Sequence, residues 1–204
     1  AIIPNYDKDG ALEILNRLKS KLDELKIEYI IPKRDSELSK CDFIITIGGD
    51  GTIIHAAKKG AKTGLPILGI HNGRLGYLAD ITPDEIENIS NIITGDYIIE
   101  ERMLLEVAVN GKKYYCLNDA VISKGSLSRM IDINVTVDDS IITYRADGLI
   151  AATPTGSTAY SMSAGGPVVD PKLELFVITP ICSNSLFDRP ILFNDNSIIN
   201  ISVS

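Results

Sequence analysis

The first half of the chain alternates short apolar runs with amphipathic segments. Residues 43–47 and 66–70 are short and mostly apolar, which predicts buried strands. Residues 9–25 carry leucines at intervals of three or four, which predicts a helix. The same reasoning predicts shorter elements, namely strands over 2–4 and 28–31, a helical turn over 36–40 and a helix over 53–59.

A further helix is predicted over residues 83–93, because Thr82 is a suitable N-terminal cap and Gly95 a suitable stop. Strands separated by helices imply a parallel sheet with helices on both faces. We therefore predict a Rossmann-like α/β N-terminal domain over residues 1–95.

The second half of the chain has a different pattern. Residues 97–109 and 113–117 flank Asn110-Gly111, a typical hairpin turn, and residues 131–137 and 141–144 flank a second turn. Further short strands are predicted over 149–152, 176–178, 191–193 and 198–203. The pattern predicts a mostly antiparallel, β-rich C-terminal domain over 96–204. Because 198–203 is a strand with almost nothing after it, we expect the chain to be truncated at the C-terminus.

The glycine-rich turn Gly48-Gly49-Asp50-Gly51-Thr52 joins a predicted strand to a predicted helix. This geometry directs backbone N–H groups and a helix N-terminus at one place, which suits phosphate, and glycine lets an anion approach the backbone. A carboxylate would repel phosphate. Asp50 is therefore better explained as a base or as a partner of magnesium.

Two polar segments of the second half are candidate binding residues. Residues 153–163 combine small, hydroxyl-bearing and glycine residues with Tyr160, whose ring offers a face for stacking. Such a segment is commonly a surface loop, but its apolar flanks and low charge favour a packed site. Asn118-Asp119 either ends a strand, or reads a base edge and two ribose hydroxyls.

Composition narrows the choice of partners and compartment. The 204 residues carry a net charge of −7, which argues against general affinity for nucleic acid or an anionic membrane. No apolar run reaches the roughly 18 residues that span a bilayer. Three scattered cysteines are typical of buried thiols in a reducing cytoplasm, and two histidines make a zinc centre improbable, so we expect no resident metal site and a cytoplasmic location.

Taken together, the motifs resemble those of the NAD kinase family. The resemblance covers most of the chain and rests on the glycine–aspartate turn and on segments 73–78, 117–121, 147–148, 153–160, 163–167, 179–182 and 189–190. The first motif also occurs in lipid kinases and phosphofructokinases, whereas the 153–160 segment is far more specific. The family transfers a phosphoryl group from ATP, or in some members polyphosphate, to the 2′-hydroxyl of the NAD adenosine ribose.

The resemblance implies a role for each matching residue. Asp50 is implied as the catalytic general base or as the carboxylate that orients the ribose hydroxyl, with Gly48, Gly49, Gly51 and Thr52 near phosphate and Gly51 also beside NAD. Asn118 is implied to read the adenine and Asp119 the ribose hydroxyls. The other implied NAD-binding residues are Arg129, Arg145, Asp147, Thr158, Ala159, Tyr160, Ser161, Met162 and Ser163. Arg74, in the 73–78 segment, is a further phosphate candidate.

The resemblance also implies Mg²⁺ accompanying ATP, and a homodimer or homotetramer in which Arg145 and Asp147 act across a subunit interface. One departure is Ser183-Asn184, where many members have proline and histidine. Two other functions stay open on the residues alone. A non-catalytic NAD(P) sensor would keep Asn118 and Tyr160, and a lipid or sugar kinase would share only the glycine–aspartate turn.

Overall fold

The computed structural model describes residues 1–73, 76–125 and 129–204. The chain divides into two compact units, Ala1–Glu100 and Glu101–Ser204. The first unit is built on a parallel sheet and the second on antiparallel sheets, as the sequence predicts.

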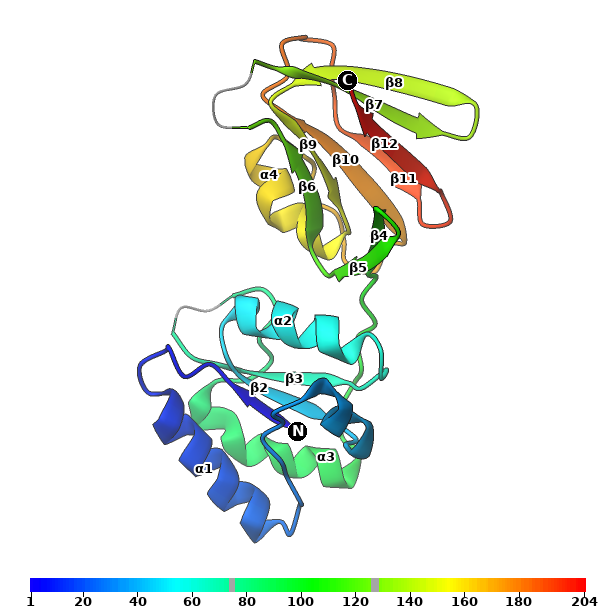
Figure 1. Cartoon of the computed structure of the whole chain (residues 1–204). Helices are drawn as coiled ribbons and strands as arrows, with labels where there is room; N and C mark the ends of the chain where they lie inside the picture. Colours follow the sequence, from blue (N-terminus) through cyan, green and yellow to red (C-terminus); the bar gives the residue numbers. More distant parts are fainter. Residues whose placement is uncertain (74–75, 126–128) are drawn as a thin grey trace. The chain divides into compact units, whose positions relative to one another are not determined.

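The N-terminal unit contains three parallel strands in the order β1-β2-β3 (Figure 1). Its strands are β1 (Ile2–Pro4), β2 (Ile44–Gly48) and β3 (Ile67–His71). Its helices are α1 (Ala11–Glu24), α2 (Asp50–Gly60), α3 (Ser90–Thr94) and the 3₁₀ helices η1 (Asp35–Lys40) and η2 (Pro83–Ile89). The connection from β2 to α2 is a single residue, Gly49, so the strand leads directly into the helix.

Helices cover both faces of this sheet. On one face Ile45 and Ile47 of β2 share a core with Leu18 of α1 and Ile89 of η2. On the other face Ile44 packs with Ala56 of α2 and with Leu38. Successive strand residues point to opposite faces, so a single apolar run supplies both cores. Figure 1 shows α2 on one side of the strands and α1 with α3 on the other.

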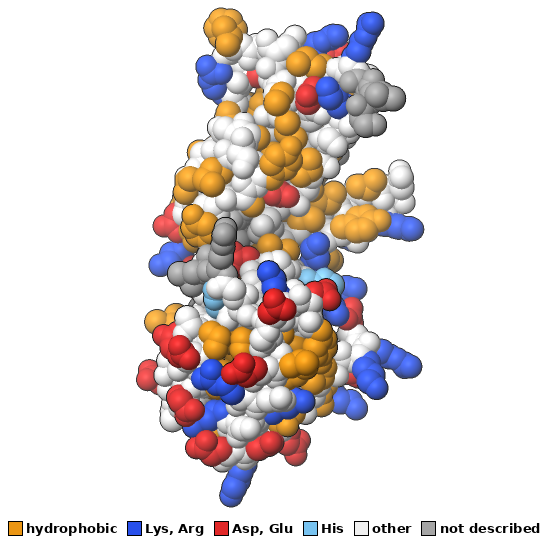
Figure 2. Space-filling view, turned by 90° about the vertical axis from the view of Figure 1, so that its left-hand side faces the viewer, with side chains coloured by type: hydrophobic (Ala, Val, Ile, Leu, Met, Phe, Trp, Pro, Cys, Tyr) orange, Lys and Arg blue, Asp and Glu red, His pale blue; other side chains and the backbone are white. Residues whose placement is uncertain are grey.

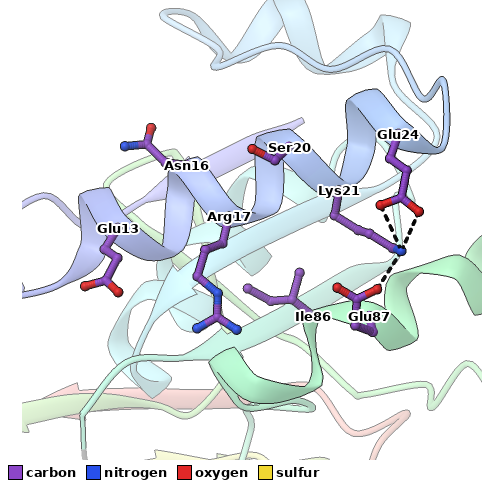
Figure 3. Close-up of a pocket in the computed structure, with 8 residues that line it drawn as sticks. All are labelled: Glu13, Asn16, Arg17, Ser20, Lys21, Glu24, Ile86 and Glu87. Atoms are coloured by element: carbon purple, nitrogen blue, oxygen red, sulfur yellow. Dashed lines mark hydrogen bonds and ion pairs between the residues drawn. The ribbon is translucent and has the colours of Figure 1, made fainter.

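A hollow between α1 and η2 is lined in part by an ion pair (Figure 3). Lys21 Nζ lies 2.6 Å from Glu87 Oε2 and 3.1 Å from Glu24 Oε1. Its hydrogen bonds, first to Glu87 and then to Glu24, raise the pKa of Lys21. Thr82 and Glu85 form a capping box at the start of η2, and the left-handed Gly95 ends α3, as the sequence predicts.

The C-terminal unit contains three antiparallel sheets with strand orders β11-β10-β9-β6, β12-β7-β8 and β4-β5. The first sheet comprises β6 (Asp119–Ser123), β9 (Gly148–Ala152), β10 (Leu175–Ile181) and β11 (Ile191–Asn194). The others comprise β4 (Leu105–Val109), β5 (Lys112–Cys116), β7 (Ile131–Val137), β8 (Ser140–Ala146) and β12 (Ile199–Val203). The short helices η3 (Thr155–Thr158) and α4 (Tyr160–Ser163) follow β9.

One core joins the two larger sheets of this unit. Ile133 and Tyr144 of one sheet pack with Leu149 and Ile178 of the other. The buried Tyr144 hydroxyl donates a hydrogen bond to the Arg189 carbonyl at 3.2 Å, and burial raises the pKa of Tyr144 to about 12. The predicted hairpin turn is present, with Asn110 and Gly111 both at positive φ.

Three predictions of local structure from the sequence differ from the observed elements, and one strand was not predicted. Residues 28–31 are not a strand, because only the Ile30 carbonyl pairs with β1, through Ile2 N at 2.8 Å. The predicted strand over 97–109 is limited to β4, because β5 pairs with five residues only. The predicted helix over 83–93 is a 3₁₀ helix followed by a short α-helix. Strand β6 was not predicted.

Burial on α1 provides a test of the N-terminal core. Leu18 is fully buried, whereas Leu12 on the same helix is 62% exposed. We expect Leu18→Ala to lower the free energy of unfolding by about 2–5 kcal/mol, because it removes buried methyl groups and leaves a cavity. Leu12→Ala is the matched control and should change it by less than about 0.5 kcal/mol. Urea unfolding followed by circular dichroism measures both, and equal losses would contradict this packing.

Candidate functional site

The Asp50 carboxylate is held by two consecutive backbone amides. Tyr77 N donates to Oδ2 at 2.8 Å and Leu78 N donates to Oδ1 at 3.2 Å. Asp50 is the first residue of α2, directly after the glycine turn that ends β2. The turn therefore fixes the backbone of Asp50, and the segment after β3 fixes the orientation of its side chain.

The glycines around Asp50 have different structural tasks. A Cβ on Gly76 would overlap the Asp50 carboxylate, and one on Gly48 would overlap the Thr52 side chain. Among the residues that the structure describes, a Cβ on Gly49 or Gly51 would meet nothing within 4 Å. Gly76 and Gly48 are therefore required for packing. Gly49 and Gly51 leave the backbone at the start of α2 open to a bulky anion.

The predicted phosphate residues are thus not equivalent in the structure. Gly48 is buried and Thr52 is half-buried, with Asn5 Nδ2 donating to Thr52 Oγ1 at 3.5 Å. Gly51 is exposed, and Gly49 is half-buried but open at its Cα. Arg74, the further phosphate candidate, lies outside the described residues.

In the C-terminal unit, the backbone around Asn118 is packed against the segment that follows β9. Thr153 N donates to the Asn118 carbonyl at 2.8 Å, and Gly156 N donates to Thr153 Oγ1 at 3.1 Å. A Cβ on Gly156 would overlap the Asn118 backbone. Asn118 Oδ1 is buried and has no hydrogen-bond partner among the described residues, which leaves an acceptor for a ligand donor.

Asp119 begins β6 beside Asn118, and its half-buried carboxylate accepts a hydrogen bond from the backbone N–H of Tyr160. Burial raises the pKa of Asp119, and the Tyr160 hydrogen bond partly offsets that rise. The structure therefore brings Asn118, Asp119 and Tyr160 together, although the last is some 40 residues away in the chain.

The hydroxyl-rich segment divides into an inner and an outer set. Ser157 and Ser161 are fully buried: Val169 N donates to Ser157 Oγ at 3.0 Å, and Ser161 Oγ lies 2.9 Å from Thr179 Oγ1. The outer set is Thr158, Ala159, Tyr160, Met162 and Ser163, which are half-buried or exposed. The Ser161 hydroxyl therefore holds α4 against β10, while its neighbours face outwards. Figure 2 shows hydrophobic side chains on one face of the C-terminal unit.

Three predicted NAD-binding residues lie apart from this group. Arg145 of β8 pairs with Asp132 at 3.5 Å, Asp147 Oδ1 pairs with Lys124 Nζ at 2.7 Å, and Arg129 is exposed. Strands β6 and β9 run antiparallel. Asp147 precedes one end of β9, and Asp119 pairs with Ala152 at the other end. About five residues at ~3.3 Å each therefore separate the two carboxylates along the strands.

Sequence reasoning missed the Tyr77 and Leu78 amides and the Lys124 partner of Asp147. A backbone donor has no side-chain signature in the sequence. The glycine at position 76, where a Cβ would overlap the Asp50 carboxylate, is the sequence signal that could have indicated this contact. Among residues 1–73, 76–125 and 129–204, no group of three or more His, Cys, Asp or Glu side chains is arranged to hold a metal ion. No helix in the described ranges is long and apolar enough to cross a membrane.

An α/β unit with a carboxylate at a glycine turn, followed by an antiparallel unit in which Asn118, Asp119 and Tyr160 lie together, fits a nucleotide-dependent phosphotransferase. The model of the ATP-NAD kinase N-terminal domain matches residues 32–97, and that of the ATP-NAD kinase C-terminal domain matches residues 117–204. The chain belongs to the NAD kinase family, a family of transferases, which confirms the resemblance seen in the sequence.

Individual relatives agree with this assignment. A protein of Caldicellulosiruptor saccharolyticus named NAD kinase is 42% identical over 98% of this chain and 78% of its own length. A Clostridium botulinum (strain Kyoto) protein of the same name is 45% identical over 98% of this chain and 75% of its own length.

Solved structures agree with the predicted fold class. Yeast NADH kinase complexed with NADH matches with a TM-score of 0.87 and 25% identity, over 99% of this chain and 71% of that one. An NAD kinase from Archaeoglobus fulgidus in complex with ATP matches with a TM-score of 0.82 and 30% identity, over 99% and 79%. The predicted α/β unit followed by an antiparallel β-rich unit is confirmed.

The raised pKa of Asp119 generates a stability prediction. A carboxyl whose folded pKa lies above its ordinary 3.8 stabilises the fold below that value, and this contribution is lost as pH rises through the folded pKa. At pH 7 the buried charge therefore opposes folding. We expect Asp119→Asn to raise the free energy of unfolding of the ligand-free protein at pH 7, with no gain below about pH 3.8.

Thermal unfolding at several pH values measures this effect. The matched control is Asp139→Asn, since Asp139 is exposed in the turn between β7 and β8. A lower melting temperature for Asp119→Asn than for the unsubstituted protein at pH 7 would show that the Asp119 charge does not destabilise the fold.

Proposed function

We propose that this chain transfers the γ-phosphoryl group of ATP to the 2′-hydroxyl of the adenosine ribose of NAD, giving NADP and ADP. The observation that carries the proposal is the Asp50 carboxylate, held at an open glycine turn in a member of the NAD kinase family. A related NAD kinase has been solved with ATP and a related NADH kinase with NADH. Both nucleotides are therefore the natural substrates to test.

Asp50 is the proposed general base. A ribose hydroxyl is a weak nucleophile, and a positioned carboxylate that takes its proton contributes about 10²–10⁴ in rate. The ribose oxygen then forms a bond to the γ-phosphorus, the bond from that phosphorus to the bridging oxygen breaks, and ADP leaves. The amides of Tyr77 and Leu78 each donate one hydrogen bond to a different oxygen of the Asp50 carboxylate. Each oxygen therefore keeps a lone pair that can accept from the ribose hydroxyl.

Asn118 and Asp119 are proposed to bind the adenosine of NAD. The buried, unpartnered Asn118 Oδ1 is suited to accept a hydrogen bond from an adenine amino group. The Asp119 carboxylate is suited to accept from ribose hydroxyls, which would compensate for its burial. Tyr160 would stack on a ring, with Thr158, Ala159, Met162 and Ser163 lining the pocket and Ser161 supporting it from inside.

The open backbone at Gly49 and Gly51 is proposed to receive donor phosphates, together with the start of α2. Magnesium would arrive as part of the Mg·ATP substrate, because phosphates supply most of its ligands in such sites. Polyphosphate remains an alternative donor for the same site.

Arg145, Asp147 and Arg129 are proposed to serve the nicotinamide end or the phosphates of NAD. For Asp147, its separation from Asp119 along β6 and β9 supports this division. In a homodimer or homotetramer they would act on the dinucleotide of a neighbouring subunit. We further propose a cytoplasmic location, where both nucleotides are abundant.

The two alternative functions make different predictions. A non-catalytic NAD(P) sensor would bind NAD but form no NADP, and a lipid or sugar kinase would phosphorylate another acceptor. The amide contacts to Asp50 favour catalysis over sensing, because a sensor has no need of an oriented carboxylate. The polar groups of Asn118 and Asp119 beside Tyr160 favour a dinucleotide over a lipid.

The first functional test is Asp50→Asn. We expect it to lower kcat by about 10²–10⁴ while NAD affinity changes less than about threefold, because it removes the base but not the adenosine pocket. Formation of NADP, read with a dehydrogenase specific for NADP, gives the rate, and calorimetry gives the affinity. Asp42→Asn, an exposed aspartate just before β2, is the control. Full activity of Asp50→Asn would rule out the assigned role.

The second test concerns Tyr160. Loss of one stacking face costs about 1–3 kcal/mol, so Tyr160→Ala should raise KM for NAD roughly 10-fold with a smaller change in KM for ATP. Tyr114→Ala is a matched control, because Tyr114 in β5 is similarly exposed, at 53% against 46%. Equal effects of both substitutions on KM for NAD would contradict a stacking role.

A further inference from the structure

The segment from Gly76 to Ile81 is tied to the protein at both ends. At its first end, the amides of Tyr77 and Leu78 bind the Asp50 carboxylate. At its second end, Asp80 and Ile81 bind Gly69 of β3. The segment thus bridges the edge of the sheet and the proposed general base.

Asp80 makes the central contact at the second end. Its Oδ2 accepts a hydrogen bond from Gly69 N at 2.7 Å, and its own N–H donates to the Gly69 carbonyl at 2.9 Å. Ile81 N donates to the same carbonyl at 3.1 Å, and His71 N donates to the Ile81 carbonyl at 2.8 Å. The side chain of Asp80 therefore binds the N–H group of Gly69, and its backbone binds the carbonyl of the same residue.

The fit at Gly69 is tight as well as hydrogen-bonded. A Cβ on Gly69 would lie 3.2 Å from the Ala79 Cα and 2.6 Å from the Ile53 Cδ1 of α2. The segment is therefore packed directly on β3 beside α2, the helix that begins with Asp50. A shift of Asp80 would move Ala79 and, one residue further, the Leu78 amide.

We propose that Asp80 is a positioning residue for Asp50: by anchoring the 76–81 segment to Gly69, it holds the Tyr77 and Leu78 amides where they orient the carboxylate. This rests on the proposed role of Asp50 as the general base. Displacing a reacting group by about 1 Å lowers rates on the order of 100-fold. Asp80 thereby affects the chemical step without contacting a substrate.

A purely structural role for Asp80 makes different predictions. Its carboxylate would then satisfy the buried N–H group of Gly69 without affecting Asp50, and its loss would lower stability without changing kcat of the folded enzyme. Three measurements distinguish the two roles: the change in kcat compared with the change in KM, the recovery of activity by asparagine at position 80, and the exchange rates of the Tyr77 and Leu78 amides.

The kinetic experiment compares Asp80→Ala, Asp80→Asn and Asp84→Ala with the parent, per mole of folded enzyme. We expect Asp80→Ala to lower kcat by about 10- to 100-fold, with KM for NAD within about threefold. Asp80→Asn should recover most of the rate, because an amide oxygen also accepts from Gly69 N. Asp84→Ala is the control, since that carboxylate is 96% exposed. Parent-like kcat in Asp80→Ala, or no rescue by asparagine, would overturn the proposal.

Hydrogen exchange tests the same proposal without relying on activity. In Asp80→Ala the Tyr77 and Leu78 amides should exchange at least ~10-fold faster than in the parent, while amides of α1 keep their rates. Unchanged exchange at both amides would overturn the proposal even if NADP formation falls. If the parent forms no NADP, the proposed function fails, and the exchange rates alone still decide whether Asp80 orders the Asp50 contacts.

Discussion

The N-terminal site depends on one constraint: a carboxylate at the start of a helix must be kept in a single orientation. The glycine turn after β2 supplies the position of Asp50, and two consecutive amides after β3 supply its orientation. Gly76 is required because any side chain there would occupy the carboxylate's place. Two connections at the same end of the parallel sheet thus converge on one side chain, which is the usual location of ligand sites in α/β folds.

In the C-terminal unit, a small apolar core supports the polar segment that follows β9. Buried hydroxyls of Thr153, Ser157 and Ser161 accept or donate hydrogen bonds inside the unit, so the loop after β9 is ordered without exposing them. That order leaves the neighbouring Tyr160 side chain free to face outwards. The inner residues therefore determine where the outer ones are presented.

The sequence predicted most of the fold because periodicity and glycine turns are local signals. It failed where a strand depends on its partner: residues 28–31 are apolar but make one backbone hydrogen bond to β1, whereas β6 pairs fully with β9 despite having no turn signal before it. Asp50 and Asn118-Asp119 could be named as candidate site residues from the sequence, because their side-chain chemistry is visible there. The amides of Tyr77 and Leu78 could not, because a backbone donor is common to every non-proline residue.

Asp119 shows how binding and stability oppose one another in this unit. Its burial disfavours the charged form, and one amide from Tyr160 only partly compensates. A ligand that donates hydrogen bonds from two hydroxyls would satisfy further lone pairs of the Asp119 carboxylate. The burial of Asp119, which is unfavourable in the free protein, would then favour such a ligand in the complex. The same reasoning applies to the unpartnered Asn118 Oδ1. An adenosine that supplies donors to both neighbours is favoured over a ligand that satisfies only one, because the other would stay buried without a partner.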